Sequence, residues 1–298
     1  MTFFLLALAV GIGGALAWYA VMVAWYAVMV APATLLLTRF DVPIAGLPAS
    51  FDGYRIAVLT DFHHGPQQPV ERARRAVAYA NSQGPHLVVL LGDYGTSEGG
   101  MKGISRDLYQ QMFAVLGPAL RELRARDGIL AVLGNHDFYA DAQHTTSWLE
   151  SLGVRVLRNA SIEIGGGDGG NGGALRFVGI DDLVSGRVSA DTIHALTHGD
   201  QPTVVLSHHP DVVRYCTQPS VRLVLAGHTH GGQVVFPFVG ALVTRSTICT
   251  RLHPAGWVPN VFAPLFVSRG IGVQVPLRFR CAPEVVVLTL RCSPQQPV

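Results

Sequence analysis

Charged side chains are scarce in this sequence. They make up only 14% of its 298 residues and are absent from Met1 to Thr38, which is a low share for a purely soluble protein. The net charge is only +2, and no dense basic stripe occurs, so nothing in the composition favours a nucleic-acid partner. The length allows one large domain or two small ones.

Cysteine is also scarce, and a nucleotide-binding P-loop is absent. The four cysteines lie far apart without a CxxC pair, so the sequence predicts neither a disulfide framework nor a thiolate zinc site, and it leaves the redox compartment open. The glycine-rich run GGGDGGNGG at 165–173 lacks a following helix and Lys-Ser/Thr, which excludes a phosphate-binding loop of that type. We expect it to be the flexible tip of a hairpin between two strands.

The uncharged start of the chain is long enough to cross a membrane. About 20 apolar residues span a bilayer as a helix, and residues 1–38 exceed that length. A cleavable signal peptide is the alternative, but its usual basic start is missing and the apolar region is too long. We therefore expect a transmembrane anchor over 1–38. GIGG at 11–14 leaves open whether it is one helix or a short hairpin.

A different pattern begins near Phe51. Short runs rich in Val, Ile and Leu, each ending in Asp, His or Asn, occur five times: YRIAVLTDFHH (54–64), LVVLLGDYG (87–95), ILAVLGNHD (129–137), TVVLSHH (203–209) and LVLAGHTH (223–230). Such runs are typical of strands buried on both faces. Helix-like stretches separate the first four runs, which predicts a layered α/β domain.

Polar side chains at the ends of these strands indicate a metal centre. Ligands of open α/β sheets bind beyond the carboxyl ends of the strands, so one rim is expected to carry Asp61, His63, Asp93, Asn135, His136, His208, His228 and His230. A single Asp after a strand usually caps a turn, but the same explanation for five strands is improbable. Crowded carboxylates and imidazoles need positive charge, and they are ligands for Mn, Fe or Zn. We expect two divalent ions.

The ordered set DFH, GDY, GNHD, SHH and GHTHGGQ resembles the five sequence blocks of the calcineurin-like metallophosphoesterase family. The stretch SRGIGVQVPLRFRCAPEVVVLTL at 268–290 is similar to the membrane-anchored bacterial branch that includes the YkuE- and YaeI-type phosphodiesterases. The resemblance implies an α/β fold, a four-layer α-β-β-α sandwich, over 51–292. Residues 39–50 would then be a linker and 293–298 a tail.

The resemblance also implies roles for the matching positions. Two metal sites would share Asp93 as a bridge, the first held by Asp61, His63 and His230 and the second by Asn135, His208 and His228. Two cations together orient a phosphate and lower the pKa of a bridging water until it is hydroxide near neutrality. Manganese is the expected metal, with iron or zinc as alternatives.

His136 would be the general acid for the leaving alkoxide, because imidazole titrates near neutral pH; the alternative is that it only lines the strand end. Asp137 would hold the orientation of His136. Many family members have a second Asp where this chain has Thr96. That Asp is thought to orient the catalytic histidine, so its absence puts the tuning of His136 in doubt.

Several further positions are candidate substrate contacts or structural residues. His64 is a possible substrate or phosphate contact, whereas His209 is expected to face away from the site. Arg269 and Arg278 would pair either with a phosphate or with an internal acid, and the acid is favoured for both.

These observations predict a membrane-anchored enzyme that hydrolyses a phosphodiester or pyrophosphate bond through a metal-bridging hydroxide. The anchor favours an amphiphilic substrate, for which UDP-2,3-diacylglucosamine is one candidate. The alternatives are a phosphodiesterase or phosphatase acting on soluble substrates and a non-catalytic membrane adaptor. The expected location is the bacterial inner membrane, and Arg39 after the apolar segment favours a cytoplasmic catalytic domain. The sequence does not identify the oligomeric state.

Overall fold

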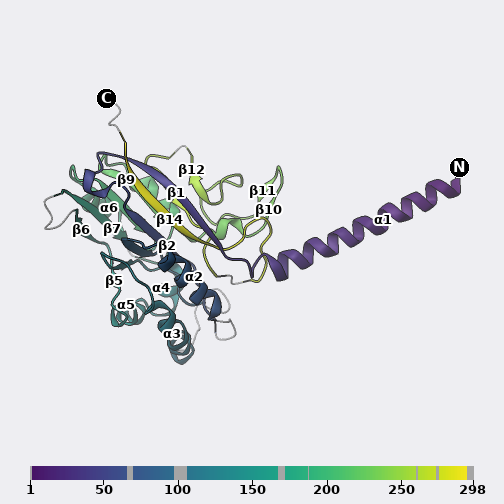
Figure 1. The fold of residues 1–298 in the computed structure, drawn as a ribbon, viewed down its shortest axis with the longest axis horizontal. Helices are drawn as coiled ribbons and strands as arrows, with labels where there is room; N and C mark the ends of the chain where they lie inside the picture. Colours follow the sequence, from purple (N-terminus) through teal and green to yellow (C-terminus); the bar gives the residue numbers. More distant parts are fainter. Residues whose placement is uncertain are drawn as a thin grey trace.

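The computed structural model describes residues 2–65, 70–96, 106–166, 172–186, 188–259, 261–272 and 275–293. Figure 1 shows a long N-terminal helix that extends away from an α/β domain. The domain is built on two sheets of six strands each, and a separate two-stranded hairpin lies near the long helix.

The first sheet combines strands from both ends of the chain. Its spatial order is β1 (Leu36–Ala45), β14 (Glu284–Ser293), β2 (Arg55–Leu59), β3 (Leu87–Leu90), β4 (Ile129–Ala131) and β5 (Arg155–Val156). Strands β2 to β5 are parallel to one another, β14 is antiparallel to β2, and β1 is parallel to β14. The parallel part accounts for the nearly continuous apolar runs in the sequence.

The second sheet contains the later strands of the domain. Its order is β12 (Gly256–Val258), β13 (Leu265–Val267), β9 (Val221–Ala226), β8 (Thr203–Ser207), β7 (Ala174–Ile180) and β6 (Ala160–Gly165). Strands β7, β8, β9 and β13 are parallel, whereas β6 and β12 pair antiparallel at the two edges. Gly165 opposes Ala174, so the hairpin expected around 165–173 is confirmed. Residues 167–171 of that run lie outside the described residues.

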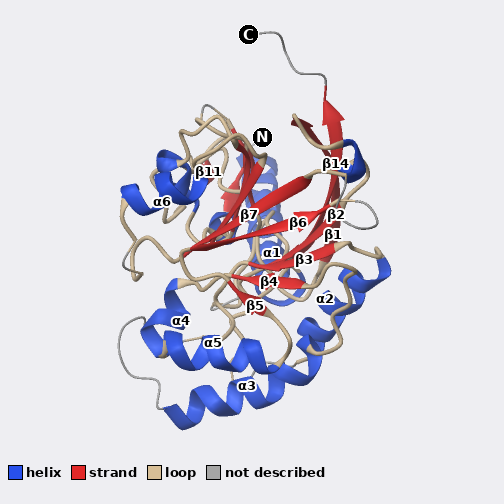
Figure 2. Cartoon of the chain, turned by 90° about the vertical axis from the view of Figure 1, so that its left-hand side faces the viewer, coloured by secondary structure: helices blue, strands red, loops and turns tan. Residues whose placement is uncertain are grey.

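Helices cover the outer faces of both sheets. The helices are α2 (Glu71–Ser82), α3 (Arg106–Leu120), α4 (Asn135–Ala140), α5 (Ala142–Ser151) and α6 (Ala190–Thr197). Figure 2 shows α2 to α5 on one side of the sheets and α6 on the other. Helix, sheet, sheet and helix therefore form four layers, and the predicted α/β sandwich is confirmed.

Alternate residues of the strands face different cores, as the two-residue period of a strand requires. In β2, Ile56 and Val58 are buried between the two sheets. Their neighbours Ala57 and Leu59 pack on the opposite face, in the core that α2 and α3 cover. In β8, Val205 belongs to the third core, which includes side chains of α6. Each sheet is thus buried on both faces, which leaves its strand ends as the places where polar groups gather.

The linker predicted at 39–50 is wrong, because most of that stretch belongs to the domain. Strand β1 pairs with β14 from Leu36 opposite Glu284 to Ala45 opposite Ser293. Val42 and Ile44 are buried in the core between the sheets. The single Pro43 between them concealed the strand, although a proline is tolerated in an edge strand such as this one.

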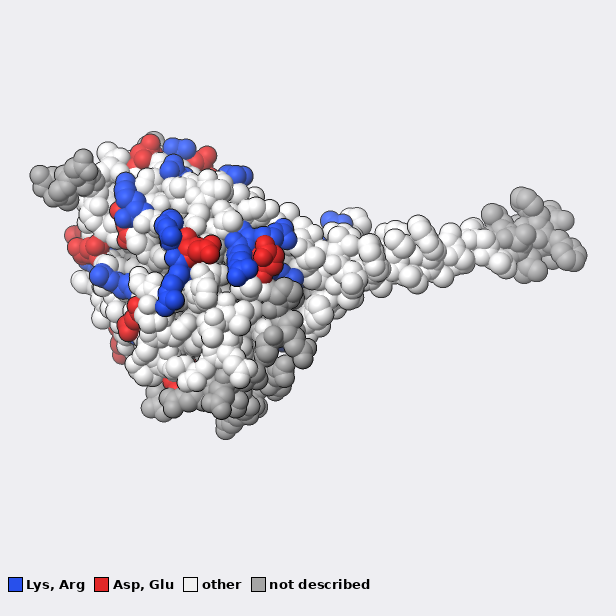
Figure 3. Space-filling view, turned by 60° about the horizontal axis from the view of Figure 1, so that its bottom comes forward, with Lys and Arg blue, Asp and Glu red and all other residues white. Residues whose placement is uncertain are grey.

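The N-terminal segment forms one continuous helix, and the hairpin alternative is not found in its described residues. Helix α1 (Thr2–Trp25) runs through GIGG and continues into a π-helix at Tyr26–Val30. The stretch Val10–Val30 is long and apolar enough to cross a bilayer, and only 6% of it is buried; an N-terminal signal sequence would have the same properties. Residues 10–25 of α1 contain no Asp, Glu, Lys or Arg, and Figure 3 shows this part of the helix in white as it extends from the domain.

We predict that β1 contributes to the stability of the domain. Replacing Ile44, which is 1% exposed, with Ala should lower the free energy of unfolding by about 2–5 kcal/mol because it leaves a cavity in the core. Leu36→Ala, at a position that is 40% exposed in the same strand, is the matched control and should change it by about 0.5 kcal/mol or less. Chemical denaturation of the detergent-solubilised chain measures both. Equal, small effects would mean that β1 does not pack in solution.

Candidate metal centre

The seven candidate metal ligands lie together at one edge of the sandwich. Each follows a strand, in the order Asp61 and His63 after β2, Asp93 after β3, Asn135 after β4, His208 after β8, and His228 and His230 after β9. Strands β2, β3 and β4 are parallel, as are β8 and β9. Their carboxyl ends therefore meet at one edge, and the two sheets bring both sets of loops to the same place.

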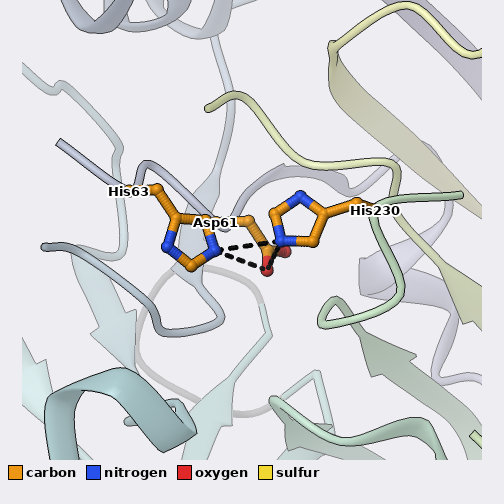
Figure 4. A group of neighbouring side chains, drawn as sticks. All are labelled: Asp61, His63 and His230. Atoms are coloured by element: carbon orange, nitrogen blue, oxygen red, sulfur yellow. Dashed lines mark hydrogen bonds and ion pairs between the residues drawn. The ribbon is translucent and has the colours of Figure 1, made fainter. Parts of the chain in front are cut away.

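The first group consists of Asp61, His63 and His230, whose side chains point toward one another in Figure 4. Nε2 of His63 lies 2.9 Å from Nε2 of His230. Oδ1 of Asp61 lies 3.8 Å from Nε2 of His63 and 3.5 Å from Nε2 of His230. All three residues are buried, and their ligand atoms lie within 4.8 Å of one another. This is the spacing that donor atoms around a single cation require.

The second group consists of Asn135, His208 and His228. Nδ1 of His228 lies 3.0 Å from Oδ1 of Asn135 and 3.2 Å from Nε2 of His208. Nδ1 of His208 lies 2.7 Å from the carbonyl oxygen of Leu91. A backbone carbonyl accepts but does not donate, so Nδ1 of His208 carries a proton and Nε2 faces the group.

Asp93 connects the two groups. Its Oδ2 lies 3.4 Å from Nε2 of His63 in the first group and 3.1 Å from Nε2 of His208 in the second. Its Oδ1 accepts a hydrogen bond of 2.9 Å from the backbone N–H of His136. A carboxylate in this position has an oxygen within reach of donor atoms from both groups, as a bridging ligand requires.

The backbone of the site is in an unusual conformation. Five of the candidate ligands have a positive φ, namely Asp61, His63, Asp93, His228 and His230. Non-glycine residues rarely adopt such angles, and each one costs on the order of 1–3 kcal/mol. Strain of this kind is typical of functional sites, where the geometry of the side chains matters more than local stability.

Two glycines make room for the carboxylates of the site. A Cβ at Gly134 would overlap the carboxylate of Asp93, and a Cβ at Gly227 would lie only 2.5 Å from Oδ2 of Asp61. Gly134 precedes the ligand Asn135, and Gly227 precedes His228. The glycines of GNHD and GHTH are therefore required because the end of another strand approaches their backbone closely.

The charges of the site fit divalent cations. Asp61 and Asp93 are almost fully buried, and within the described residues their ion pairs are with imidazoles only. Burial raises the pKa of Asp61 to about 6. Burial would also raise the pKa of Asp93, but neighbouring His208 holds it well below its usual value. Buried carboxylates with neutral imidazoles around them form a donor set for a cation.

Most of the imidazoles are held neutral, as metal ligation requires. Burial lowers the pKa of His63 to about 3, and it lowers the pKa values of His228 and His230 well below the usual range. His208 is the exception: burial opposes its protonation, but Asp93 raises its pKa well above the usual value. A cation beside Asp93 would take the place of that proton.

His136 lies beside the first group. Its ring centroid is 4.9 Å from that of His63 at an angle of 88°, and its ligand nitrogen is close enough to His63 and Asp93 to form a further three-residue group with them. Burial lowers the pKa of His136, so it is mainly neutral near pH 7 without substrate. A phosphate anion nearby would favour its protonated form.

Asp137 holds together the two loops that carry Asp93 and Asn135. Its Oδ2 accepts hydrogen bonds of 2.8 Å from the backbone N–H groups of Asp93 and Gly134. Its Oδ1 accepts from the N–H of Tyr94 and the hydroxyl of Tyr109. The carboxylate of Asp137 thus fixes the backbone of the two loops that carry Asp93 and Asn135. The sequence had predicted a different role for it, the orientation of His136.

Arg269 and Arg278 are occupied inside the protein. Nη2 of Arg269 lies 2.5 Å from Oε2 of the buried Glu284, which agrees with the favoured internal-acid alternative, and a substrate contact by Arg269 stays a prediction. Arg278 is fully buried and pairs with backbone instead of an acid. Its Nη1 donates to the carbonyl oxygen of His230 at 2.7 Å, and its Nη2 to that of Gly272 at 2.8 Å.

His64 and Thr96 belong to one pair of adjacent loops. His64 is buried, its backbone N–H donates to the carbonyl oxygen of Tyr94, and its carbonyl oxygen accepts from the N–H of Thr96. The backbone of His64 thus joins the loop after β2 to the loop after β3. A substrate contact by its side chain stays a prediction.

Three residues near the site were missed or misjudged in the sequence. His209 does not face away, because its ring centroid lies 4.4 Å from that of His228. Asp182 is buried after β7, and its charge adds to that of Asp93 in raising the pKa of His208; it follows the run ALRFVGI in the same way that the other acids follow their strands. Arg245 adds to the effect of burial in lowering the pKa values of His136 and His228, and no sequence pattern marked it.

Comparison with known proteins agrees with this geometry. The profile of the calcineurin-like phosphoesterase family matches residues 54–232, which contain all seven candidate ligands. The chain belongs to the calcineurin-like phosphoesterase family. It is therefore a hydrolase of the metallophosphoesterase type, a family that uses divalent metals.

Three relatives of this phosphoesterase are similar over most of its length. The uncharacterized metallophosphoesterase YkuE of Bacillus subtilis is 30% identical, covering 88% of this chain and 87% of the relative. The phosphodiesterase YaeI of Escherichia coli is 28% identical, covering 80% and 82%. A transmembrane protein with metallophosphoesterase domain from Bos taurus is 28% identical, covering 87% of this chain but only 57% of its own length.

We predict that metal binding releases protons. Asp61 has a pKa of about 6 and His208 a raised pKa, and both must be deprotonated to bind a cation. The apparent affinity for Mn²⁺ should therefore rise with pH, steeply below about pH 6, where Asp61 is protonated, and further at higher pH as His208 loses its proton. Calorimetric titrations in buffers of different ionisation enthalpy measure the protons released. An affinity independent of pH would contradict this assignment.

Proposed function

We propose that this phosphoesterase is a membrane-anchored enzyme with two divalent metal ions that hydrolyses a phosphodiester or pyrophosphate bond. The observation that carries the proposal is the position of Asp93. Its Oδ2 lies 3.4 Å from Nε2 of His63 and 3.1 Å from Nε2 of His208. It joins two groups of donor side chains, each of which fits one cation. Asp61, His63 and His230 are assigned to the first ion, and Asn135, His208 and His228 to the second.

The residues of the site would divide the work between them. Two divalent ions in these positions supply Lewis acidity, which polarises a phosphate and lowers the pKa of water. Asp93 holds both groups at a fixed separation, and the neutral amide of Asn135 leaves the site with net positive charge toward an anionic substrate. The nearby charge of Arg245, felt at His136 and His228, adds to that attraction.

His136 is proposed as the general acid. Its ring lies beside His63 at the edge of the cluster, and its backbone is fixed by the hydrogen bond to Asp93. Once an anionic phosphate has raised its pKa, it can donate a proton to the leaving oxygen. Manganese is the proposed metal, with iron or zinc as alternatives, because carboxylate, amide and imidazole ligands suit all three.

The proposed substrate is amphiphilic, and UDP-2,3-diacylglucosamine is one candidate. Helix α1 has the length and composition of a membrane span, and the Bos taurus relative is named as a transmembrane protein. An anchor of this kind would hold the site near lipid substrates. We propose the bacterial inner membrane as its location, with the domain on the cytoplasmic side because Arg39 follows the apolar segment.

Two other functions compete with this proposal. The name of the Escherichia coli relative, a phosphodiesterase, also fits an enzyme that acts on soluble phosphodiesters. A membrane adaptor without activity is disfavoured, because strained backbone and buried charge would be retained at a cost in stability without a benefit.

We predict that bis-p-nitrophenyl phosphate is hydrolysed and that two variants separate metal binding from proton transfer. Asp93→Ala should abolish turnover and reduce bound metal, because it removes the ligand shared by both groups. His136→Ala should lower kcat by about 10²–10⁴-fold with the metal content unchanged. His198→Ala, an exposed histidine outside the site, is the control. A wild-type chain that binds no metal and shows no turnover would support the adaptor.

The lipid substrate needs a separate test. Incubating the full-length, manganese-loaded chain with UDP-2,3-diacylglucosamine should release UMP if the pyrophosphate bond of this lipid is cleaved. Hydrolysis of bis-p-nitrophenyl phosphate without UMP release would remove this substrate and leave the phosphoesterase activity in place. Release of UMP measured by chromatography, compared with the Asp93→Ala variant, distinguishes enzymatic cleavage from background.

A further inference from the structure

A small hairpin exposes apolar side chains to solvent. It consists of β10 (Val235–Phe236) and β11 (Gly240–Ala241), and Phe238 at its tip is 101% exposed. The other exposed apolar side chains of this apolar hairpin are Phe236, Val239, Leu242 and Val243, with exposed fractions between 42% and 59%. A contiguous apolar surface of this kind on a protein marks an interaction site.

The tip of the hairpin is held in a strained conformation that keeps its aromatic ring in solvent. Phe238 has a φ of 64°, which is an uncommon and strained backbone conformation for a bulky residue. Neither burial nor a ring contact compensates for this within the described residues. The ring of Phe238 is therefore free to contact a surface outside the domain.

The apolar hairpin lies directly beside the end of helix α1. The backbone N–H of Val235, in the hairpin, donates to the carbonyl oxygen of Phe279 at 3.0 Å. Arg278, which precedes Phe279 in the chain, donates its backbone N–H to the carbonyl oxygen of Ala27, near the end of the apolar helix, at 2.8 Å. One short segment, 278–279, is therefore bonded to both the hairpin and the end of the apolar helix. Figure 1 shows β10 and β11 at the end of the domain from which α1 extends.

The apolar helix reaches the surface of the domain without a spacer. Its candidate span ends at Val30, and the next residue, Ala31, is already 1% exposed. About 20 helical residues cross the hydrocarbon core, so a bilayer around Val10–Val30 comes up to the face where α1 joins the domain. The apolar hairpin and the exposed Leu277 lie at that face.

The charge of this region suits an anionic membrane surface. No Asp or Glu occurs between Asp211 and Glu284, a stretch that contains the whole hairpin. Between the hairpin and Glu284, the exposed arginines among the described residues are Arg245, Arg251 and Arg280. Basic side chains near a bilayer are attracted by anionic phospholipids, and apolar or aromatic side chains beside them enter the boundary between headgroups and acyl chains.

We propose that the apolar hairpin is a second membrane contact, which inserts Phe238 and its neighbours into the interfacial layer of an anionic bilayer beside α1. The proposal rests on the membrane anchoring proposed above. The hairpin also follows the site closely in the chain, because Val235 comes soon after the turn His230–Gly232, whose first residue is a candidate ligand. Two contacts, helix and hairpin, would fix the orientation of the metal centre relative to the membrane.

Depth-dependent fluorescence quenching in the full-length chain tests the proposal. Cys292 is exposed and the other three cysteines are buried, so Cys292→Ser gives a background for single labels. An environment-sensitive fluorophore is attached at Phe238→Cys, at Val21→Cys in α1, or at Val184→Cys, which is exposed in the loop between β7 and α6. Each chain is reconstituted into phosphatidylcholine–phosphatidylglycerol vesicles with nitroxide-labelled lipids.

We expect the label at position 238 to show blue-shifted emission and to lose fluorescence to the nitroxide lipids, as the label at 21 does, whereas the label at 184 does not. Quenching at 21 but not at 238 would overturn the second contact and leave the anchor intact. Absence of quenching at both positions would overturn the anchor as well. In vesicles of phosphatidylcholine alone, quenching at 238 should weaken, and an unchanged signal would contradict the role of anionic lipid.

A charge variant provides an independent check. With the label moved to Leu242→Cys, the double substitution Phe238→Asp and Val239→Asp should abolish quenching, because carboxylates resist insertion. Both positions are exposed, so the domain should still fold, and unchanged metal content confirms that it does. Persistent quenching in this variant would mean that the hairpin tip does not insert.

Discussion

The structure depends on how the negative charges of two buried carboxylates are balanced. Asp61 and Asp93 lie at the junction of the two sheets, and within the described residues only imidazoles pair with them. Burying a carboxylate without a counter-charge is costly, and a cation bound between Asp61, Asp93 and the imidazoles around them would supply that counter-charge at the edge of the sandwich. The close glycines make room for these carboxylates, and the hydrogen bonds of Asp137 hold the loops that carry Asp93 and Gly134 in place, although several ligands have strained, positive φ angles.

Much of the site could be predicted because the end of a buried strand can be recognised in the sequence, where an apolar run is followed by a polar residue. Buried parallel strands read as apolar runs, and the polar residue after each run must lie at the sheet edge. That reasoning brought together His208 and Asp93, which are far apart in the chain. It also would have found Asp182 after β7, had the same rule been applied to that strand. The α/β sandwich followed from the alternation of strands and helices.

Other features depend on distant contacts that no local pattern contains. Strand β1 is identified by its pairing with β14, and the Pro43 within it is typical of a loop. The positive φ angles of Asp61 and His228 result from the convergence of loops from two sheets. Arg278 is buried against backbone carbonyls of the loop that carries His230, whereas an arginine in sequence predicts an acidic or phosphate partner.

The pairing of the first sheet has a consequence for biosynthesis. The last strand, β14, is inserted between β1 and β2, so the two earliest strands do not join one sheet until the C-terminal end of the domain has been made. Contacts of such high sequence separation form late, and nearly the whole domain must have been synthesised before this sheet can close. During that interval an emerging α1 could already enter a bilayer, leaving the nascent domain tethered but open and dependent on protection from aggregation.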